Sequence, residues 1–440
     1  PVDFTTYPRT APGEQAAFQG PAQWTEREVE HLFNRAAFGA RGSVIRSWVQ
    51  KSPVELVDHL LEAEEEHEPF YIEAQEGFGL SARGRSANEK RALTLSLRAV
   101  DRRQFQAFVA WWFERMLRGE DPLRERMTLF WHGYFATSMD VVKRSSFMIR
   151  QNELLREHAL GSYGSLLREI LRDPAMLVYL DNDESKKEHP NENLARELFE
   201  LFSLGEGNYS ERDVKEAARA LTGRTVERGE YVFDMEAHDR DLKLIFGRRG
   251  NIGGNQLVDL ILQQAACPRF VARRLLHWFE GVEPTPERLQ AYADLLQASD
   301  YEMRPVLRRL FLDPEFYRAD VLGARVSSPV EYLLGSAHRL GIEPPAAFLA
   351  VAASLLGQAL LEPPSVKGWD EGPAWITTAS LMQRGNLAGA MLDVLEVRPA
   401  CQAQKNAAIA PTPAARPSML SSRLKAFITR MSHMMETGMA

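Results

Sequence analysis

The sequence predicts a mainly α-helical protein, with one large multi-helix body and one small β-hairpin inserted in it. Apolar residues recur every three or four positions in one segment after another, which is the spacing of a helix face. Only the stretch from Thr225 to Phe233 alternates around a turn, at Arg228-Gly229, as a hairpin does. With 45% hydrophobic and 26% charged residues, the composition is that of an ordinary folded protein.

Charge and hydropathy argue against a nucleic-acid partner and against a membrane-spanning helix. The 440 residues include 53 Lys and Arg against 60 Asp and Glu, a net charge of −7, so we expect no nucleic-acid partner. No apolar run reaches the roughly 18 residues that a bilayer-spanning helix needs, so we expect no transmembrane segment. Cys267 and Cys401 form no CxxC motif and exclude a cysteine-rich zinc site, but their spacing leaves open whether they pair.

Caps and apolar spacing predict the helices in chain order. Thr25, with acidic residues after it, predicts a first helix start, and Ser52-Pro53 predicts a second. The longest helix is expected at 88–117, because aromatic and aliphatic residues mark its whole length. The full set is expected at 25–38, 52–62, 88–117, 123–135, 145–157, 162–172, 174–181, 191–204, 210–222, 255–265, 268–280, 285–298, 303–312 and 328–340.

The glycine-rich segment 247–254 is predicted to be a loop. It lacks both a preceding strand and the GK[ST] ending of a phosphate-binding loop, so we interpret it as a turn. The segment 70–88 has no apolar residues at helical or strand spacing and is expected to be a long loop.

Composition divides the chain into four parts. The helical body is expected to span 24–398, with the hairpin insertion at about 225–246. Four prolines in residues 1–23 indicate an extended arm, and residues 399–417 are an Ala/Pro-rich linker. Residues 418–440 are expected to form an amphipathic tail helix, for which the sequence leaves open docking on its own body, on a partner groove or on a membrane surface. Because the sequence begins at Pro1 rather than Met, we expect a processed or trimmed chain.

The polar face of the helix at 191–204 carries the first candidate site. Glu192 and Glu197 can act as general acid and base if burial separates their pKa values. The alternative is a solvated face stabilised by ion pairs four residues apart. The helix start is crowded with groups that suit a polar ligand, and we assign substrate binding to Asn191, Asn193 and Arg196.

Three further segments supply candidates. His238-Asp239 follows the hairpin and is assigned a catalytic role, with Lys243 as a substrate-binding residue; the alternative is a surface loop. His132 lies at the aromatic-rich end of a predicted helix. It is expected to be either a ligand-binding residue or a histidine of the core. The Pro/Gly-rich loop at 363–375 offers side chains that can bind or stack on a ligand, or fill a hole in the core, namely Lys367, Trp369 and Trp375.

No metal site is assigned, and the cofactor is unknown. A nitrogen and oxygen site could be assembled from His132, His189, His238 and Asp239, but no HExxH motif supports it. No GxSxG motif is present, so a serine-hydrolase triad is not predicted.

Several of these segments together resemble the bacterial DUF1800 family. They are Leu123–His132, Phe135–Ser138, Asn191–Leu198, Ala220–Gly223, His238-Asp239, Ser328–Glu331 and Pro364–Trp369. The resemblance covers about 27–395 and implies a bacterial, usually exported protein, often encoded beside a DUF1501 protein of the alkaline phosphatase and sulfatase type. It therefore implies a periplasmic or secreted location and a DUF1501-like partner. The family commonly has HNHFATS where this chain has His132-Gly133-Tyr134-Phe135, and the missing second His weakens a metal site there.

Three functions follow as hypotheses. The leading one is an exported hydrolase or related glycan-active enzyme whose cleft gathers Glu192, Glu197, His238, Asp239 and Trp369. The second is a metal-dependent phospho- or sulfo-ester hydrolase. The third is a non-catalytic binding or maturation partner of a neighbouring exported protein, acting through the tail helix.

Overall fold

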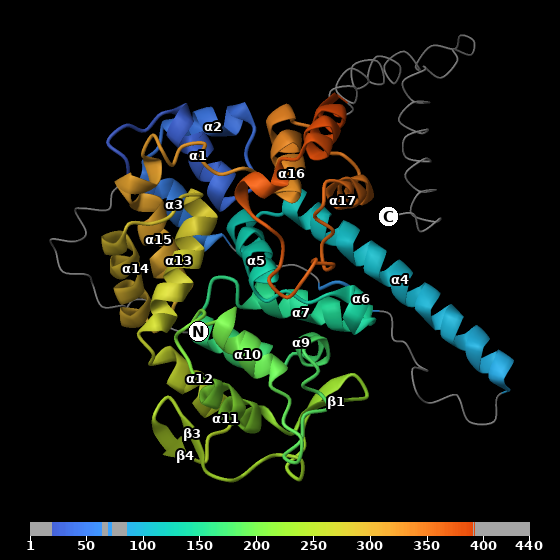
Figure 1. Cartoon of the computed structure of the whole chain (residues 1–440). Helices are drawn as coiled ribbons and strands as arrows, with labels where there is room; N and C mark the ends of the chain where they lie inside the picture. Colours follow the sequence, from blue (N-terminus) through green and yellow to red (C-terminus); the bar gives the residue numbers. More distant parts are fainter. Residues whose placement is uncertain (1–19, 64–68, 73–85, 390, 392–440) are drawn as a thin grey trace.

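The computed structural model describes residues 20–63, 69–72, 86–389 and 391, and the chain is mainly α, as predicted (Figure 1). The predicted N-terminal arm lies almost wholly outside this range, and so do the linker and the tail helix. No helix in the described part is long and apolar enough to cross a membrane.

The first and last thirds of the chain pack together in the upper part of Figure 1. Helix α3 (Pro53–Glu62) contacts α15 (Met303–Leu312), and α1 (Glu26–Ala36) contacts α13 (Ala266–Glu280). Residues some 250 positions apart in the sequence therefore lie side by side. Capping boxes begin α1, α3 and α16, as the Ser and Thr residues at their starts predict. The elements are α1 (Glu26–Ala36), α2 (Gly42–Val49), α3 (Pro53–Glu62), α13 (Ala266–Glu280), α14 (Pro286–Ala298), α15 (Met303–Leu312), the 3-10 helix η3 (Pro314–Tyr317), α16 (Pro329–Leu340) and α17 (Ala346–Leu355).

The helix α5 (Pro122–Tyr134) is the centre of the core. Nearly all its side chains are buried, including the charged Glu125 and Arg126 and the imidazole of His132. Burying ionisable groups is costly unless partners compensate them, so each of these three needs an explanation. The helices α4 (Ala87–Arg118), whose first half extends away from the body in Figure 1, and α7 (Ser145–Glu157) pack against α5, and α6 (Met139–Val142) packs against α7.

Short helices and two hairpins form the lower part of Figure 1. The first hairpin is the predicted one, with Arg228 and Gly229 both at positive φ, as a two-residue hairpin turn requires. Phe246 and Gly247 make the same turn in a second hairpin, where the sequence predicted only a loop. The elements are α8 (Tyr163–Ile170), α9 (Pro174–Tyr179), α10 (Asn193–Glu200), α11 (Glu211–Leu221), β1 (Arg224–Glu227), β2 (Glu230–Phe233), β3 (Lys243–Ile245), β4 (Arg248–Gly250) and α12 (Gly254–Leu262).

Candidate functional site

The N-terminus of α10 is organised by its own side chains. The Asn191 side chain accepts a hydrogen bond from the Asn193 backbone N–H (2.9 Å) and donates one to the Asp181 carbonyl (3.0 Å). The Asn191 backbone N–H in turn donates to Ser185 Oγ (3.0 Å). Asn191 and Asn193 therefore shape the loop that enters the helix, whatever else they contact.

The outer edge of the α10 face is a chain of ion pairs. Arg196 contacts Glu192 at 3.2 Å and Glu211 of α11 at 2.8 Å. The Glu192 and Arg196 side chains are 38% and 35% exposed, so water screens this pair and its contribution to stability is small. Glu192 and Arg196 thus form the ladder that the sequence offered as the alternative to catalysis.

Glu197 lies in a different environment on the same helix. It is half-buried, and burial, together with the nearby Glu200 carboxylate, raises its pKa despite Lys367 and Arg196. Glu197 in turn contributes to a raised pKa of Tyr179, after burial of the phenol itself. Residues of α9, α10 and the 363–375 loop therefore interact electrostatically with one carboxyl group whose pKa is raised.

The 363–375 loop is fixed to the body at two points. Gly368, at φ +80°, lies so close to α5 that an added Cβ would stand 2.5 Å from the Gly133 carbonyl oxygen. Glu371 contacts His277 of α13 at 3.5 Å. These contacts fix the loop that carries Lys367, which lowers the pKa of Glu197 electrostatically, and Trp369, whose ring packs against His132 of α5.

His132 supports this loop from below. Its ring is fully buried between Trp112 and Trp369, with ring centroids 5.1 and 5.2 Å away. Its Nε2 accepts a hydrogen bond from the Leu361 backbone N–H (3.1 Å), and burial lowers its pKa to about 3, so the ring is neutral. In this conformation His132 positions Trp369 and the chain before it and does not face solvent.

His238 and Asp239 belong to a separate cluster below α10. Asp239 is buried against Arg219, which contacts it at 2.7 Å, and this pairing lowers the pKa of Asp239 although burial opposes it. The fully buried Lys243 donates to the Asp239 carbonyl oxygen (2.6 Å). His238 bonds the Thr222 carbonyl through Nδ1 (2.9 Å), and burial lowers its pKa.

The predicted residues are thus divided into three groups. Glu197, Lys367, Trp369 and His132 are connected through the 363–375 loop, and Trp375, half-buried in the 3-10 helix η4 (Gly372–Trp375), ends that loop. The loop at the α10 start forms the second group and the Asp239 cluster the third. Among the described residues, no three His, Cys, Asp or Glu side chains are grouped so as to hold a metal ion.

Glu200, Tyr179 and Tyr209 are part of the Glu197 group and were not selected from the sequence. Tyr209 Oη donates to Glu200 Oε2 (3.3 Å). Glu200 lies three residues after Glu197, a spacing that places two side chains on one helix face. That spacing was the one signal that could have identified it.

Replacing Gly368 with alanine is expected to detach the loop from α5. The added methyl group would meet a backbone oxygen at 2.5 Å at a residue with φ +80°, and we expect a loss of roughly 1 to 3 kcal/mol of unfolding free energy. Gly133→Ala is the matched control, because its Cβ would meet nothing within 4 Å. In a helix this change should stabilise by about 0.5 to 1 kcal/mol. Urea unfolding measures both, and equal effects would show that the close approach is unimportant.

Comparison with known proteins identifies a family but no activity. A family model described as "Protein of unknown function (DUF1800)" matches residues 31–437. Comparisons with curated proteins and with solved structures gave no match. The matched range contains every residue of the groups described above.

Proposed function

The chain belongs to the DUF1800 family, and we propose that it is a hydrolase acting on glycans, with Glu197 as its proton donor. One observation carries this proposal. Glu197 is a half-buried carboxyl group with a raised pKa, on a face where a second carboxyl group, a lysine and two tyrosines gather. A carboxyl group with a raised pKa that lies near a second carboxyl group is typical of acid–base sites.

The chemistry assigns different roles to the two carboxyl groups. Glu197 holds its proton above the ordinary carboxyl pKa and would donate it to the leaving oxygen of a glycosidic bond. Glu200 would activate the attacking water, and Tyr209, which donates a hydrogen bond to Glu200, would orient this carboxylate. Trp369, half-buried beside Lys367, offers a ring face on which a sugar can stack.

We further propose a periplasmic or secreted location and a DUF1501-like partner, both on the family resemblance. The metal-dependent esterase remains an alternative hypothesis, but no metal-binding group in the described part of the chain supports it. The binding-partner hypothesis depends on the tail helix, which lies outside the described residues.

Glu197→Gln is expected to lower glycan hydrolysis by about 100-fold to 10,000-fold, the usual contribution of a general acid. The amide keeps the size of the side chain but cannot donate a proton in the same way. The assay measures new reducing ends released from a panel of bacterial and plant polysaccharides by the full chain. Glu188→Gln, at an exposed position in the loop before α10, is the matched control.

Glu200→Gln should give a loss of similar size, whereas Glu188→Gln should hydrolyse at the wild-type rate. If the wild-type chain releases no reducing ends, or if Glu197→Gln is as active as wild type, the proposal is wrong. Binding of the same polysaccharides, measured separately, distinguishes a lost catalytic group from a lost binding surface.

A further inference from the structure

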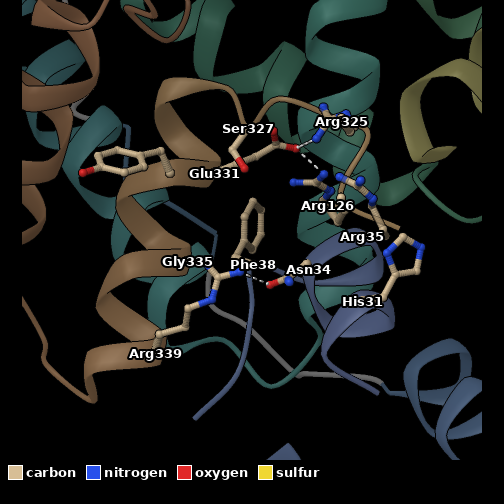
Figure 2. A pocket seen from close by; sticks show the side chains of 12 residues that line it. His31, Asn34, Arg35, Phe38, Arg126, Arg325, Ser327, Glu331, Gly335 and Arg339 are labelled. Carbon is tan, nitrogen blue, oxygen red and sulfur yellow. Dashed lines mark hydrogen bonds and ion pairs between the residues drawn. The ribbon is translucent and has the colours of Figure 1, made fainter. Parts of the chain in front are cut away.

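A second candidate site includes α5, where three arginines meet in a pocket of about 160 Å³ (Figure 2). Arg35 comes from α1, Arg126 from α5 and Arg325 from the segment before α16. Figure 2 shows the three guanidinium groups side by side, with Glu331 next to them. The rim includes Gly323 and Arg339, which are partly exposed, so the pocket reaches the surface.

The pocket contains more positive than negative charge. Glu331 forms ion pairs with both Arg126 and Arg325, and it is the one carboxylate among the side chains lining the pocket. The fourth lining arginine, Arg339, pairs with Glu30. The other three guanidinium groups against one carboxylate leave two positive charges uncompensated. Burial, followed by repulsion from Arg325, lowers the pKa of Arg35 to about 9, which is consistent with this excess.

Several buried N–H groups in the pocket have no acceptor. Arg126 is 0% exposed, and its Nε and Nη1 have no hydrogen-bond partner among the described residues. The same holds for Nε of Arg35, which is 5% exposed. Aromatic rings compensate part of this charge, because Arg126 lies 5.3 Å and Arg325 4.4 Å from the Trp278 ring centre. They provide no acceptor for the N–H groups, which native proteins rarely leave unsatisfied.

We propose that this pocket binds a tetrahedral oxyanion, a phosphate or a sulfate, either free or as the head group of a small ester. Guanidinium groups bind such oxygens through paired, charge-assisted hydrogen bonds. Three of them arriving from different elements suit a tetrahedral anion better than a planar carboxylate. One water needs about 10 to 15 Å³ of such volume, so the pocket has room for the anion and part of a substituent. Phe38, whose ring centre lies 5.5 Å from the Arg126 guanidinium carbon, and Gly335 also line the pocket and would contact the substituent.

Titration of the full chain with inorganic phosphate, inorganic sulfate and glycerol 3-phosphate tests the proposal. Calorimetry and thermal unfolding are measured at constant ionic strength, with chloride as the reference anion. We expect saturable binding and a saturable rise in Tm for the wild type. Tighter binding of glycerol 3-phosphate than of phosphate would identify an ester as the ligand, and equal binding would identify the free oxyanion.

Arg35→Met is the decisive variant, because it removes one of the three cations without breaking an ion pair of Glu331. We expect it to bind phosphate roughly tenfold to hundredfold more weakly. Arg308→Met is the matched control, since Arg308 pairs with Asp58 on the exposed surface, and it should bind as the wild type does. The proposal is overturned if the wild type shows no saturable binding, or if Arg35→Met binds as tightly as the control. The wild-type titration decides the matter even if a variant fails to fold.

Discussion

Replacing Glu331 with alanine is expected to lower the free energy of unfolding by about 3 to 5 kcal/mol. Glu331 is buried between Arg126 and Arg325, so its loss would leave both guanidinium groups buried without a counter-charge. The same carboxylate accepts the Ser328 backbone N–H (2.7 Å) and caps the start of α16. Chemical denaturation at neutral pH measures the change.

Glu343→Ala is the control for Glu331→Ala. Glu343 also contacts two arginines, Arg41 and Arg118, but its side chain is 41% exposed. Surface pairs of this kind contribute about 1 kcal/mol or less. Equal losses in the two variants would contradict the buried, unbalanced charge around Glu331.

The pH dependence of the free energy of unfolding should also report the ionisation of Glu331. Burial alone would raise the pKa of Glu331, but Arg126 and Arg325 outweigh burial and lower it from 4.5 to about 2. Because the folded-state pKa is depressed, the stabilisation is complete above pH 4.5 and is lost as the pH falls through about 2. Glu331→Ala should therefore lose less stability than wild type over this acidic range.

Replacing Glu125 with alanine is also expected to cost about 3 to 5 kcal/mol. Glu125 accepts hydrogen bonds from Trp112 (2.9 Å), Arg115 (2.9 Å) and Arg156 (2.6 Å), and so joins α4, α5 and α7 in the core. Arg156 and Arg115 hold the pKa of Glu125 below its ordinary value even though burial opposes them. Urea unfolding measures the effect.

The control for Glu125→Ala lies on α4 itself. Glu114 pairs with Arg118 one turn away, and both side chains are 53% exposed. Glu114→Ala should change stability by about 0.5 kcal/mol or less. A loss below about 1 kcal/mol for Glu125→Ala would mean that relaxation or water replaces the missing carboxylate.

The two buried clusters on α5 differ in one respect. Around Glu125, a second carboxylate from Glu153 contacts Arg156 at 3.1 Å, so two arginines meet two acids. Around Glu331, three arginines meet one acid. This difference in charge balance is why we place the oxyanion site at the second cluster.

Most helices could be predicted from the sequence because they combine a cap with one apolar face. Ser52-Pro53 begins a helix, as expected, and the structure has a capping box there and at Ser328-Pro329. The segment 346–355 gave no such signal, because its residues are apolar on all sides and lack periodicity, yet it forms α17 against α4 and α16. The helices α2 and α6 are short and were missed for lack of a clear pattern.

The second hairpin was not predictable from local sequence. Its strands have three residues each, and Phe246 occupies a left-handed position that usually favours Gly or Asn. The backbone N–H groups of Leu244 and Phe246 donate to Glu216 (2.9 Å) and Asp213 (2.8 Å) of α11. Tertiary contacts of this kind override a weak local preference.

The candidate site was predictable in part. Spacing correctly placed Glu192, Glu197 and Arg196 on one polar face, but only the structure distinguishes the half-buried Glu197 from the ion-paired Glu192. The arginine pocket gave no sequence signal, because Arg35, Arg126 and Arg325 are about 90 and 200 residues apart. Whether Glu197 and the Asp239 cluster take part in catalysis stays a prediction.

The positive charge of Arg35, Arg126 and Arg325 exceeds what Glu331 neutralises. The sign of the change in unfolding free energy caused by Arg35→Met tests this imbalance most directly. The measurement is the free energy of unfolding of Arg35→Met and wild type in chloride buffer and in saturating phosphate. Without oxyanion, we predict that the variant is more stable than wild type by about 1 kcal/mol or more, and that phosphate stabilises only the wild type. A variant that is less stable than wild type in chloride, or that gains equally from phosphate, would contradict the imbalance.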